Sequence, residues 1–133
     1  MSKRILVVDD EFYIGYLIKM ILGRRGYDVV LAFNADEALL ITSQQRFHLF
    51  LVDIAMPGMN GLELCRRLRS LAHTAATPVV MLTARGDERA KVEARESGAE
   101  QFITKPFSPK ALQRYVEDMI GAPEQDELLA KES

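Results

Sequence analysis

The chain has 133 residues, of which 48% are hydrophobic and 27% are charged, and its formal net charge is -2. This size and composition are typical of one globular domain, and the near balance of charge excludes a broad basic surface for nucleic acid or an anionic membrane. No apolar run approaches the ~20 residues of a membrane span, and the single cysteine, Cys65, excludes an internal disulfide. We therefore expect a soluble, cytoplasmic protein with Cys65 in its core.

Five short segments have the composition of β-strands. Ile5–Val8, Leu49–Val52 and Val79–Leu82 are continuous apolar runs, which are typical of parallel strands covered on both faces. Tyr27–Ala32 and Gln101–Thr104 contain polar residues and are predicted as edge strands.

Helical patterns separate these strands. Apolar residues at helical spacing predict the buried faces of the first and last helices, namely Ile14, Leu17, Ile18, Ile21 and Leu22, and Leu112, Tyr115, Val116, Met119 and Ile120. The third helix is predicted over 61–71 and the fourth over 87–97. The fourth has little to bury beyond Ala90, Val92 and Ala94, so we expect it to be loosely held.

Residues with terminal preferences agree with this periodicity. Gly26 is placed to end the first helix, Asn34 with Glu37 resembles a capping box for the second, and Ser108 with Pro109 is suited to open the last. Regular alternation of strand and helix predicts a parallel α/β sheet with helices on both faces. We assign residues 1–120 to this domain and residues 121–133 to a polar tail or the start of a linker.

Polar groups follow the predicted strands at their carboxyl ends. The first strand is followed by Asp9 and Asp10, the third by Asp53, the fourth by Thr83 and the fifth by Lys105. The carboxyl ends of parallel strands meet in one crevice, so we expect these side chains to converge there. Clustered carboxylates suit Mg²⁺, and a hydroxyl and an ammonium group suit a phosphoryl group.

Asp53 is the best candidate for the group that reacts. A carboxylate can accept a phosphoryl group when a metal and a lysine offset the charge, whereas the segment "MPGMNG" lacks the spacing and the Lys-Ser/Thr of a nucleotide-binding loop. Glu11 follows the aspartate pair, and we expect it to begin the first helix, at the favourable end of the helix dipole, rather than to join the cluster. A solvated loop of charges is the plain alternative for the acidic cluster taken alone.

Together, the motifs "LVVDDE", "LFLVDIAMPGMNGLEL", "PVVMLTARGDE" and "QFITKPF" closely resemble those of the receiver domain of two-component response regulators, over about residues 3 to 120. The resemblance implies a doubly wound fold with strand order 2-1-3-4-5. It matches Asp53 with the phosphoacceptor and Asp10 with a residue that binds Mg²⁺ directly. Asp9 matches a residue that helps to hold the metal or its water. Ala55 matches the position whose backbone carbonyl completes the metal ligands.

The resemblance also implies a switch. Thr83 matches the hydroxyl that moves to the phosphoryl group, with the small Ala84 beside it, and Lys105 matches the lysine that pairs with it through a cis bond to Pro106. Phe102 matches the aromatic switch residue. Many relatives have Tyr there, and because phenylalanine has no hydroxyl, an outward hydrogen bond from this side chain cannot be part of the active state. Without the resemblance, Phe102 would be an ordinary core aromatic and Thr83 an ordinary strand residue.

The implied partners are a sensor histidine kinase or histidine phosphotransfer protein as donor, and a target or output domain on the face of the fourth helix, fifth strand and fifth helix. Phosphorylation-dependent dimerisation is a further expectation, and turnover of an external substrate is not expected.

Tyr13, Tyr16 and Met20 form a second stripe on the first helix. The stripe is either a docking surface for the donor or a set of scattered surface residues. His48 and His73 have no predicted chemical role.

Two rival functions remain open at this stage. A phosphatase of the haloacid dehalogenase type uses similar groups but requires an Asp-x-Asp pattern at its first strand, and here Asp9 and Asp10 are adjacent. A receiver-shaped interaction module that is never phosphorylated is the other, although all the reactive groups are present. The domain is either free-standing or the N-terminal part of a longer regulator.

Overall fold

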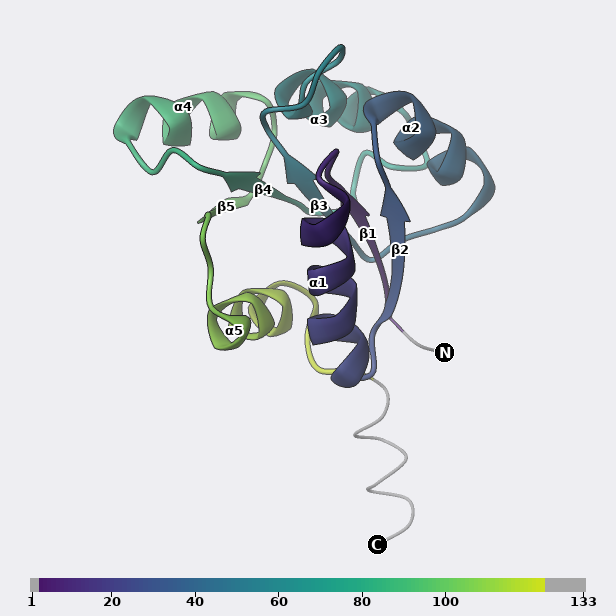
Figure 1. The fold of residues 1–133 in the computed structure, drawn as a ribbon. Coiled ribbons are helices and arrows are strands. Elements are labelled where there is room, and N and C mark those ends of the chain that lie inside the picture. The colour runs from purple at the N-terminus through teal and green to yellow at the C-terminus, as the bar shows by residue number, and fades with distance from the viewer. Residues whose placement is uncertain (1–2, 124–133) are drawn as a thin grey trace, which may run out of the picture.

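Five parallel strands form a single sheet with helices on both of its faces (Figure 1). The computed structural model describes residues 3–123. The strands are β1 (Arg4–Val8), β2 (Asp28–Ala32), β3 (Leu49–Asp53), β4 (Val79–Thr83) and β5 (Gln101–Thr104), in the order β2-β1-β3-β4-β5. The helices are α1 (Phe12–Arg24), α2 (Ala35–Gln44), α3 (Gly61–Ser70), α4 (Glu88–Glu96) and α5 (Pro109–Ile120). The predicted fold class and strand order are confirmed.

Two apolar cores lie on opposite faces of the sheet, because successive strand residues point to opposite sides. One face packs against α2, α3 and α4, and the other against α1 and α5, as the two helical layers in Figure 1 show. Leu6, Phe50 and Val52 lie in the first core with Cys65, which is buried as predicted. β1, β3 and β4 are buried along nearly their whole length, so the assignment of central strands is confirmed.

The predicted helix ends are largely confirmed. The side chain of Asn34 accepts a hydrogen bond from the Glu37 backbone (2.7 Å), and that of Ser108 accepts one from the Ala111 backbone (3.0 Å). Gly26 has a φ of 104°, which suits the turn after α1. α3 ends one residue before Leu71, and α4 is one residue shorter at each end than predicted, because the flanking residues serve as its caps.

Three apolar residues predicted to be buried are exposed instead. Leu17 is 40% exposed, Tyr115 37% and Val92 44%. In α1, Gly15 is buried, and a Cβ placed on it would lie 3.6 Å from Leu31. The buried stripe is therefore centred near Ile18, and Leu17 lies about 100° around the helix from it, at the margin.

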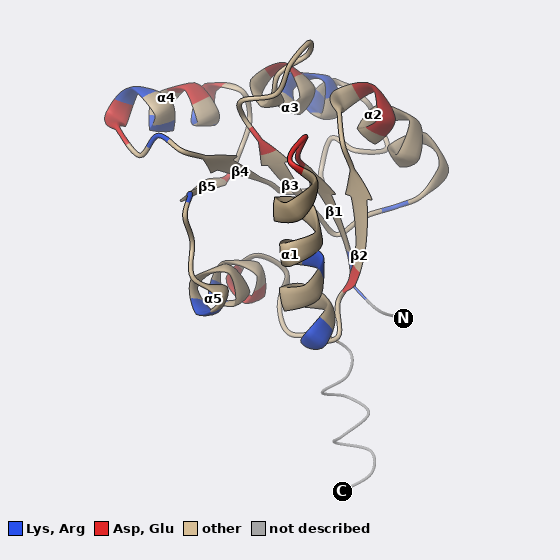
Figure 2. Ribbon diagram, viewed as in Figure 1, with Lys and Arg blue, Asp and Glu red and all other residues tan. Residues whose placement is uncertain are grey.

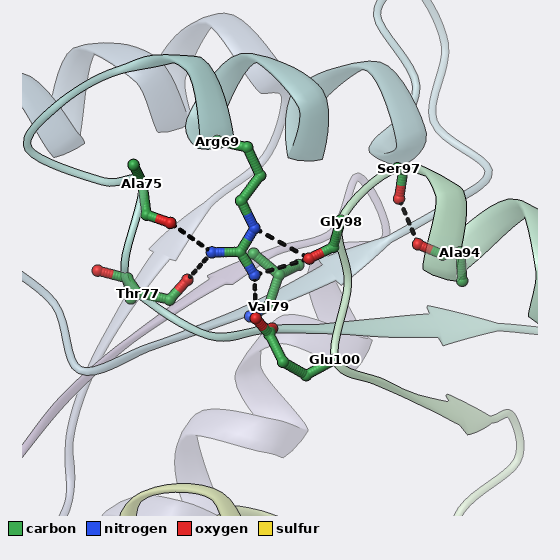
Figure 3. Close-up of polar contacts among 8 residues, drawn as sticks. All are labelled: Arg69, Ala75, Thr77, Val79, Ala94, Ser97, Gly98 and Glu100. Carbon is green, nitrogen blue, oxygen red and sulfur yellow. Dashed lines mark hydrogen bonds and ion pairs between the residues drawn. The ribbon is translucent and has the colours of Figure 1, made fainter.

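α4 buries only two small residues, Ala90 and Ala94, so its apolar contact is small, as expected. A polar anchor holds the loop that follows it (Figure 3). The guanidinium of Arg69, on α3, donates to the backbone carbonyls of Ala75, Thr77 and Gly98. It also pairs with Glu100, whose other oxygen accepts from the backbone of Val79 (2.6 Å). Arg69 therefore ties the end of α4 to the start of β4.

The end of α5 is tied to the first half of the chain. Gly121 has a φ of 80° and ends the helix. The ammonium of Lys3 donates to the carbonyl of Ile120 (2.6 Å), and the hydroxyl of Tyr27 donates to that of Gly121 (2.8 Å). Most of the predicted tail, residues 124–133, lies outside the described residues. Within 3–123, no helix has the length and apolar character needed to cross a membrane.

Candidate functional site

The carboxyl ends of β1 and β3 bring Asp9, Asp10 and Asp53 together. One carboxylate oxygen from each lies within 4.8 Å of the others. Figure 2 shows this as acidic ribbon at the end of β3 beside the acidic turn that follows β1. The predicted convergence of the three aspartates is confirmed: residues more than 40 positions apart in the sequence share one site because their parallel strands are neighbours.

Backbone contacts hold the first part of this cluster in place. The amide of Asp9 donates to the carbonyl of Ala32 (3.1 Å), which continues the pairing of β1 with β2. The carboxylate of Asp9 in turn accepts a hydrogen bond from the backbone of Glu11 (2.9 Å). Asp9 and Asp53 are buried, whereas Asp10 is half-buried. The site is therefore a largely buried group of carboxylates, and the name acidic recess denotes these three aspartates together with the side chains that contact them.

Lys105 extends from the end of β5 into the same recess. Its ammonium lies 2.9 Å from Asp9 Oδ2 and 3.4 Å from Asp53 Oδ1. The Lys105–Pro106 peptide bond is cis, as the resemblance implies. Burial alone would lower the pKa of Lys105, but the hydrogen bond to Asp9 and the negative charges of Asp53 and Asp9 raise it above its ordinary value. Lys105 is thus a fixed cation beside Asp53.

The charge of Asp53 is only partly offset. Burial and the neighbouring charge of Asp9 raise the pKa of Asp53 to about 6, although Lys105 and a hydrogen bond from the Ala55 backbone act in the opposite direction. With Asp9, Asp10 and Asp53 against a single lysine, the recess keeps excess negative charge.

This donor set fits a hard divalent cation. The clustered oxygens are carboxylate oxygens, which Mg²⁺ prefers. A cation would offset the charge of Asp9, which together with burial raises the pKa of Asp53. Ala55 follows Asp53 by two residues and is exposed, in the loop that leaves β3 beside the cluster.

Thr83 is buried at the end of β4, the strand that pairs with β3. Its hydroxyl accepts a hydrogen bond from the backbone amide of Arg85 (2.9 Å), in the loop that follows β4. Ala84, beside it, is exposed. A hydroxyl accepts through its lone pairs and donates through its own hydrogen, so Thr83 is able to donate a hydrogen bond to a phosphoryl oxygen placed beside it.

Phe102 does not lie in the acidic recess. It is half-buried on β5, in register with Met81 of β4, and packs against the core on the α4 side of the sheet. The ammonium of Lys91, on α4, lies 5.4 Å from the centroid of its ring, within the range of a cation–π contact. Phe102 therefore connects α4 with the sheet.

The second stripe on α1 is exposed, as the pattern indicated. Tyr13, Tyr16 and Met20 are among the exposed large hydrophobic residues. Phe12 joins them and packs edge-on against Phe33, with ring centroids 4.7 Å apart. The pairing of Phe12 with Phe33 was not predictable from the spacing of residues, because Phe33 belongs to the loop after β2 and only the fold brings it to α1.

The expectation that Glu11 leaves the cluster is wrong in part. Glu11 does precede α1 as its N-terminal cap residue. Its carboxylate nevertheless lies 3.6 Å from the ammonium of Lys105 and accepts a hydrogen bond from the hydroxyl of Tyr13 (2.7 Å). A lysine side chain is long enough to reach the mouth of the recess, which sequence spacing alone did not indicate.

The sequence matches known proteins along most of its length. The family model of the response regulator receiver domain matches residues 5–117. Over 109 residues the chain is 43% identical to the transcriptional regulatory protein ResD of Bacillus subtilis, covering 82% of this chain and 44% of ResD. It is 41% identical over 111 residues to the phosphate regulon transcriptional regulatory protein PhoB of Pseudomonas aeruginosa, covering 84% of this chain and 48% of PhoB. The chain therefore spans about half the length of these relatives.

Solved structures agree with this match. The chemotaxis protein CheY4 of Vibrio cholerae superposes with a TM-score of 0.87 at 30% identity, covering 90% of this chain and 99% of CheY4. The receiver domain of NtrX from Brucella abortus superposes with a TM-score of 0.81 at 35% identity, covering 87% of this chain and 97% of that domain. Sequence, fold and the acidic recess with its lysine agree, and the chain belongs to the response regulator receiver domain family.

Proposed function

We propose that this chain is a phosphoacceptor in a two-component system and that Asp53 receives the phosphoryl group. The observation that carries the proposal is the position of Lys105, whose ammonium lies within 3.4 Å of an Asp53 carboxylate oxygen beside the cluster of aspartates. A nucleophilic carboxylate, a fixed cation and clustered metal ligands are the groups that phosphoryl transfer to a protein requires.

In the proposed step, a carboxylate oxygen of Asp53 forms a bond to phosphorus while the bond from phosphorus to the donor breaks. The electron pair of that bond leaves with the donor, as acetate from acetyl phosphate or as an imidazole that takes up a proton from water. Asp10, Asp53 and the backbone carbonyl of Ala55 would hold Mg²⁺, with Asp9 supporting it. The cation supplies positive charge next to the transferring oxygens, and Lys105 supplies the second positive contact.

The switch is part of the proposal. The added phosphoryl oxygens would draw Thr83 away from the Arg85 amide, and the space that it vacates would let Phe102 turn inward. Phe102 pairs with Met81 of β4 and its ring contacts Lys91 of α4, so its movement would change how α4 packs against the sheet. The small apolar contact of α4, which buries only Ala90 and Ala94, supports α4 as the element that shifts.

The proposed partners follow from this arrangement. A sensor histidine kinase or histidine phosphotransfer protein would supply the phosphoryl group. A target, an output domain or a second copy of the chain would bind the face of α4, β5 and α5. Residues 1–120 would carry the whole cycle in the cytoplasm, and the chain would assist its own phosphorylation and dephosphorylation without turning over an external substrate. The aspartates that follow β1 are adjacent, so the Asp-x-Asp pattern of a haloacid dehalogenase-type phosphatase is absent.

The test is labelling by a small phosphodonor. Incubation with Mg²⁺ and acetyl phosphate should add one phosphoryl group to the chain, stable in acid and labile in base, because an acyl phosphate forms. Intact-mass spectrometry measures it. Asp53→Asn and removal of Mg²⁺ with a chelator should each abolish the label, and Asp36→Asn, an exposed change on α2, should retain it. Equal labelling of Asp53→Asn, or continued hydrolysis of an added phosphate ester, would reject the proposal.

The exposed aromatic face of α1 is the proposed docking site for the donor protein. It is formed by Tyr13, Tyr16 and Met20, extended by Phe12, and α1 begins directly after the acidic turn. Because buried aromatic anchors dominate protein interfaces, Tyr16→Ala combined with Met20→Ala should slow transfer from the cognate phosphohistidine donor by roughly tenfold or more, relative to the rate from acetyl phosphate.

The control for this surface is Leu40→Ala, which removes an exposed apolar side chain from α2. Rapid-quench measurement of phosphoryl transfer compares the variants. If the α1 variant retains the parental ratio of the two rates, the docking proposal is wrong.

A further inference from the structure

Lys105 has a third carboxylate neighbour beyond the two aspartates. Glu11 Oε1 lies 3.6 Å from its ammonium, compared with 2.9 Å for Asp9 and 3.4 Å for Asp53. The three differ in access to water: the side chains of Asp9 and Asp53 are 0% and 5% exposed, whereas that of Glu11 is 44% exposed. Glu11 therefore lies on the solvent side of the recess, which is called its mouth. Lys105 contacts two buried carboxylates, Asp9 and Asp53, and the exposed carboxylate of Glu11.

The carboxylate of Glu11 is held on both sides. Oε1 faces Lys105, while Oε2 accepts a hydrogen bond from the hydroxyl of Tyr13 (2.7 Å). The backbone of Glu11 is also fixed, because its amide donates to Asp9 Oδ1 (2.9 Å) and its carbonyl accepts from the first turn of α1. An unbroken series of contacts thus runs from the exposed hydroxyl of Tyr13 through Glu11 and Lys105 to Asp53.

We propose that Glu11 is a positioning residue for Lys105, oriented by Tyr13, and that it restrains phosphorylation by drawing the lysine toward the mouth of the recess. This inference rests on the proposed function of Asp53. The ammonium of Lys105 already lies 3.4 Å from Asp53 Oδ1 and 3.6 Å from Glu11 Oε1, so a phosphoryl group on Asp53 would have to share it with Glu11. The contact with Glu11 therefore competes with the contact between Lys105 and the phosphoryl oxygens. The charge of Glu11 also repels an anionic donor that enters at the mouth.

The neutral, equally sized substitution Glu11→Gln tests this. With acetyl phosphate and saturating Mg²⁺, it should speed the labelling of Asp53 on the order of fivefold, the size expected for one partly exposed charge contact. Tyr13→Phe removes only the hydroxyl and should change the rate in the same direction by a smaller factor. In the Glu11→Gln background, Tyr13→Phe should add nothing, because its effect passes through Glu11. Glu63→Gln, an exposed change on α3, is the matched charge control.

A spectroscopic measurement separates positioning from general charge. The ¹⁵N–¹H resonance of the Lys105 ammonium, assigned by its loss in Lys105→Met, should shift in Glu11→Gln and in Tyr13→Phe but not in Glu63→Gln. A Glu11→Gln rate at or below that of the parent, an unchanged Lys105 resonance, or an independent additive effect of Tyr13→Phe would overturn the inference. If the parent chain labels at Asp53 and only these differences are missing, this inference alone fails. If the parent does not label at all, the proposed function fails.

Discussion

Asp53→Asn should make the metal-free protein more stable by roughly 3 kcal/mol at pH 7.5, although it removes the proposed reactive group. The cause is the environment of the carboxylate, since burial and the charge of Asp9 raise its pKa to about 6 from an ordinary value of 3.8. Above pH 6 the folded chain must hold this charge at a cost that the unfolded chain does not bear. The neutral asparagine avoids that cost.

The sign of the pH dependence follows from the same shift. Well below the ordinary pKa of 3.8 the carboxyl of Asp53 is protonated in both the folded and the unfolded states, so its contribution to the free energy of unfolding is fully present and does not change with pH. Between pH 4 and 6 only the folded state retains the proton. The stabilising contribution of the protonated carboxyl is thus lost as the pH rises toward 6.

Urea unfolding in the presence of a chelator, repeated from pH 4 to pH 8, measures this difference. The difference in the free energy of unfolding between Asp53→Asn and the parent should grow as the pH rises over that range. It should become smaller when Mg²⁺ is added, because the cation offsets the charge of Asp53. Asp36→Asn, at the exposed first turn of α2, should show no such gap. A parent at least as stable as Asp53→Asn at pH 7.5 without metal would contradict the electrostatic account.

The fold was predictable from the sequence because several local signals agree. The apolar runs of β1, β3 and β4 are buried nearly throughout, and the caps at Asn34 and Ser108 begin helices where the periodicity does. Periodicity failed at the margins of the helices. Whether Leu17 or Gly15 faces the sheet depends on how closely α1 approaches β2, and the spacing of apolar residues does not determine that distance.

The site was predictable to the extent that it depends on topology. In a parallel sheet, Asp9 and Asp53 must emerge at the same edge, because β1 and β3 are neighbours. The contact between Glu11 and Lys105 was not predictable in this way. It depends on a long flexible side chain reaching over the recess from β5, and on a tyrosine hydroxyl that turns back toward the start of its own helix. Likewise, the sequence around Arg69 indicates only an arginine in a helix, and the backbone carbonyls that surround its guanidinium are brought there by the fold.

Gly61→Ala should cost several kcal/mol of stability and slow the labelling of Asp53 at least tenfold, a large effect for the addition of one methyl group. A Cβ on Gly61 would overlap the carbonyl oxygen of Asp53 and lie 2.9 Å from Ile54 Cα. Both are backbone atoms, so no side-chain rotation relieves the overlap. The amide of Gly61 also donates to the carbonyl of Ile54 (3.0 Å), which holds the start of α3 against the end of β3.

The methyl group must therefore push α3 away from the sheet or move the Asp53 peptide, and either movement displaces the carboxylate relative to Lys105. Gly23→Ala is the matched control. Gly23 lies in α1 with nothing within 4 Å of the added Cβ, so this change should raise stability by about 0.5–1 kcal/mol through helix propensity. Urea unfolding measures the stability of both variants, and acetyl phosphate labelling measures their activity. A Gly61→Ala chain as stable and as readily labelled as the parent would show that the turn between β3 and α3 can yield without moving Asp53. The reactive carboxylate would then depend on its strand alone, and not on how closely the following helix packs against it.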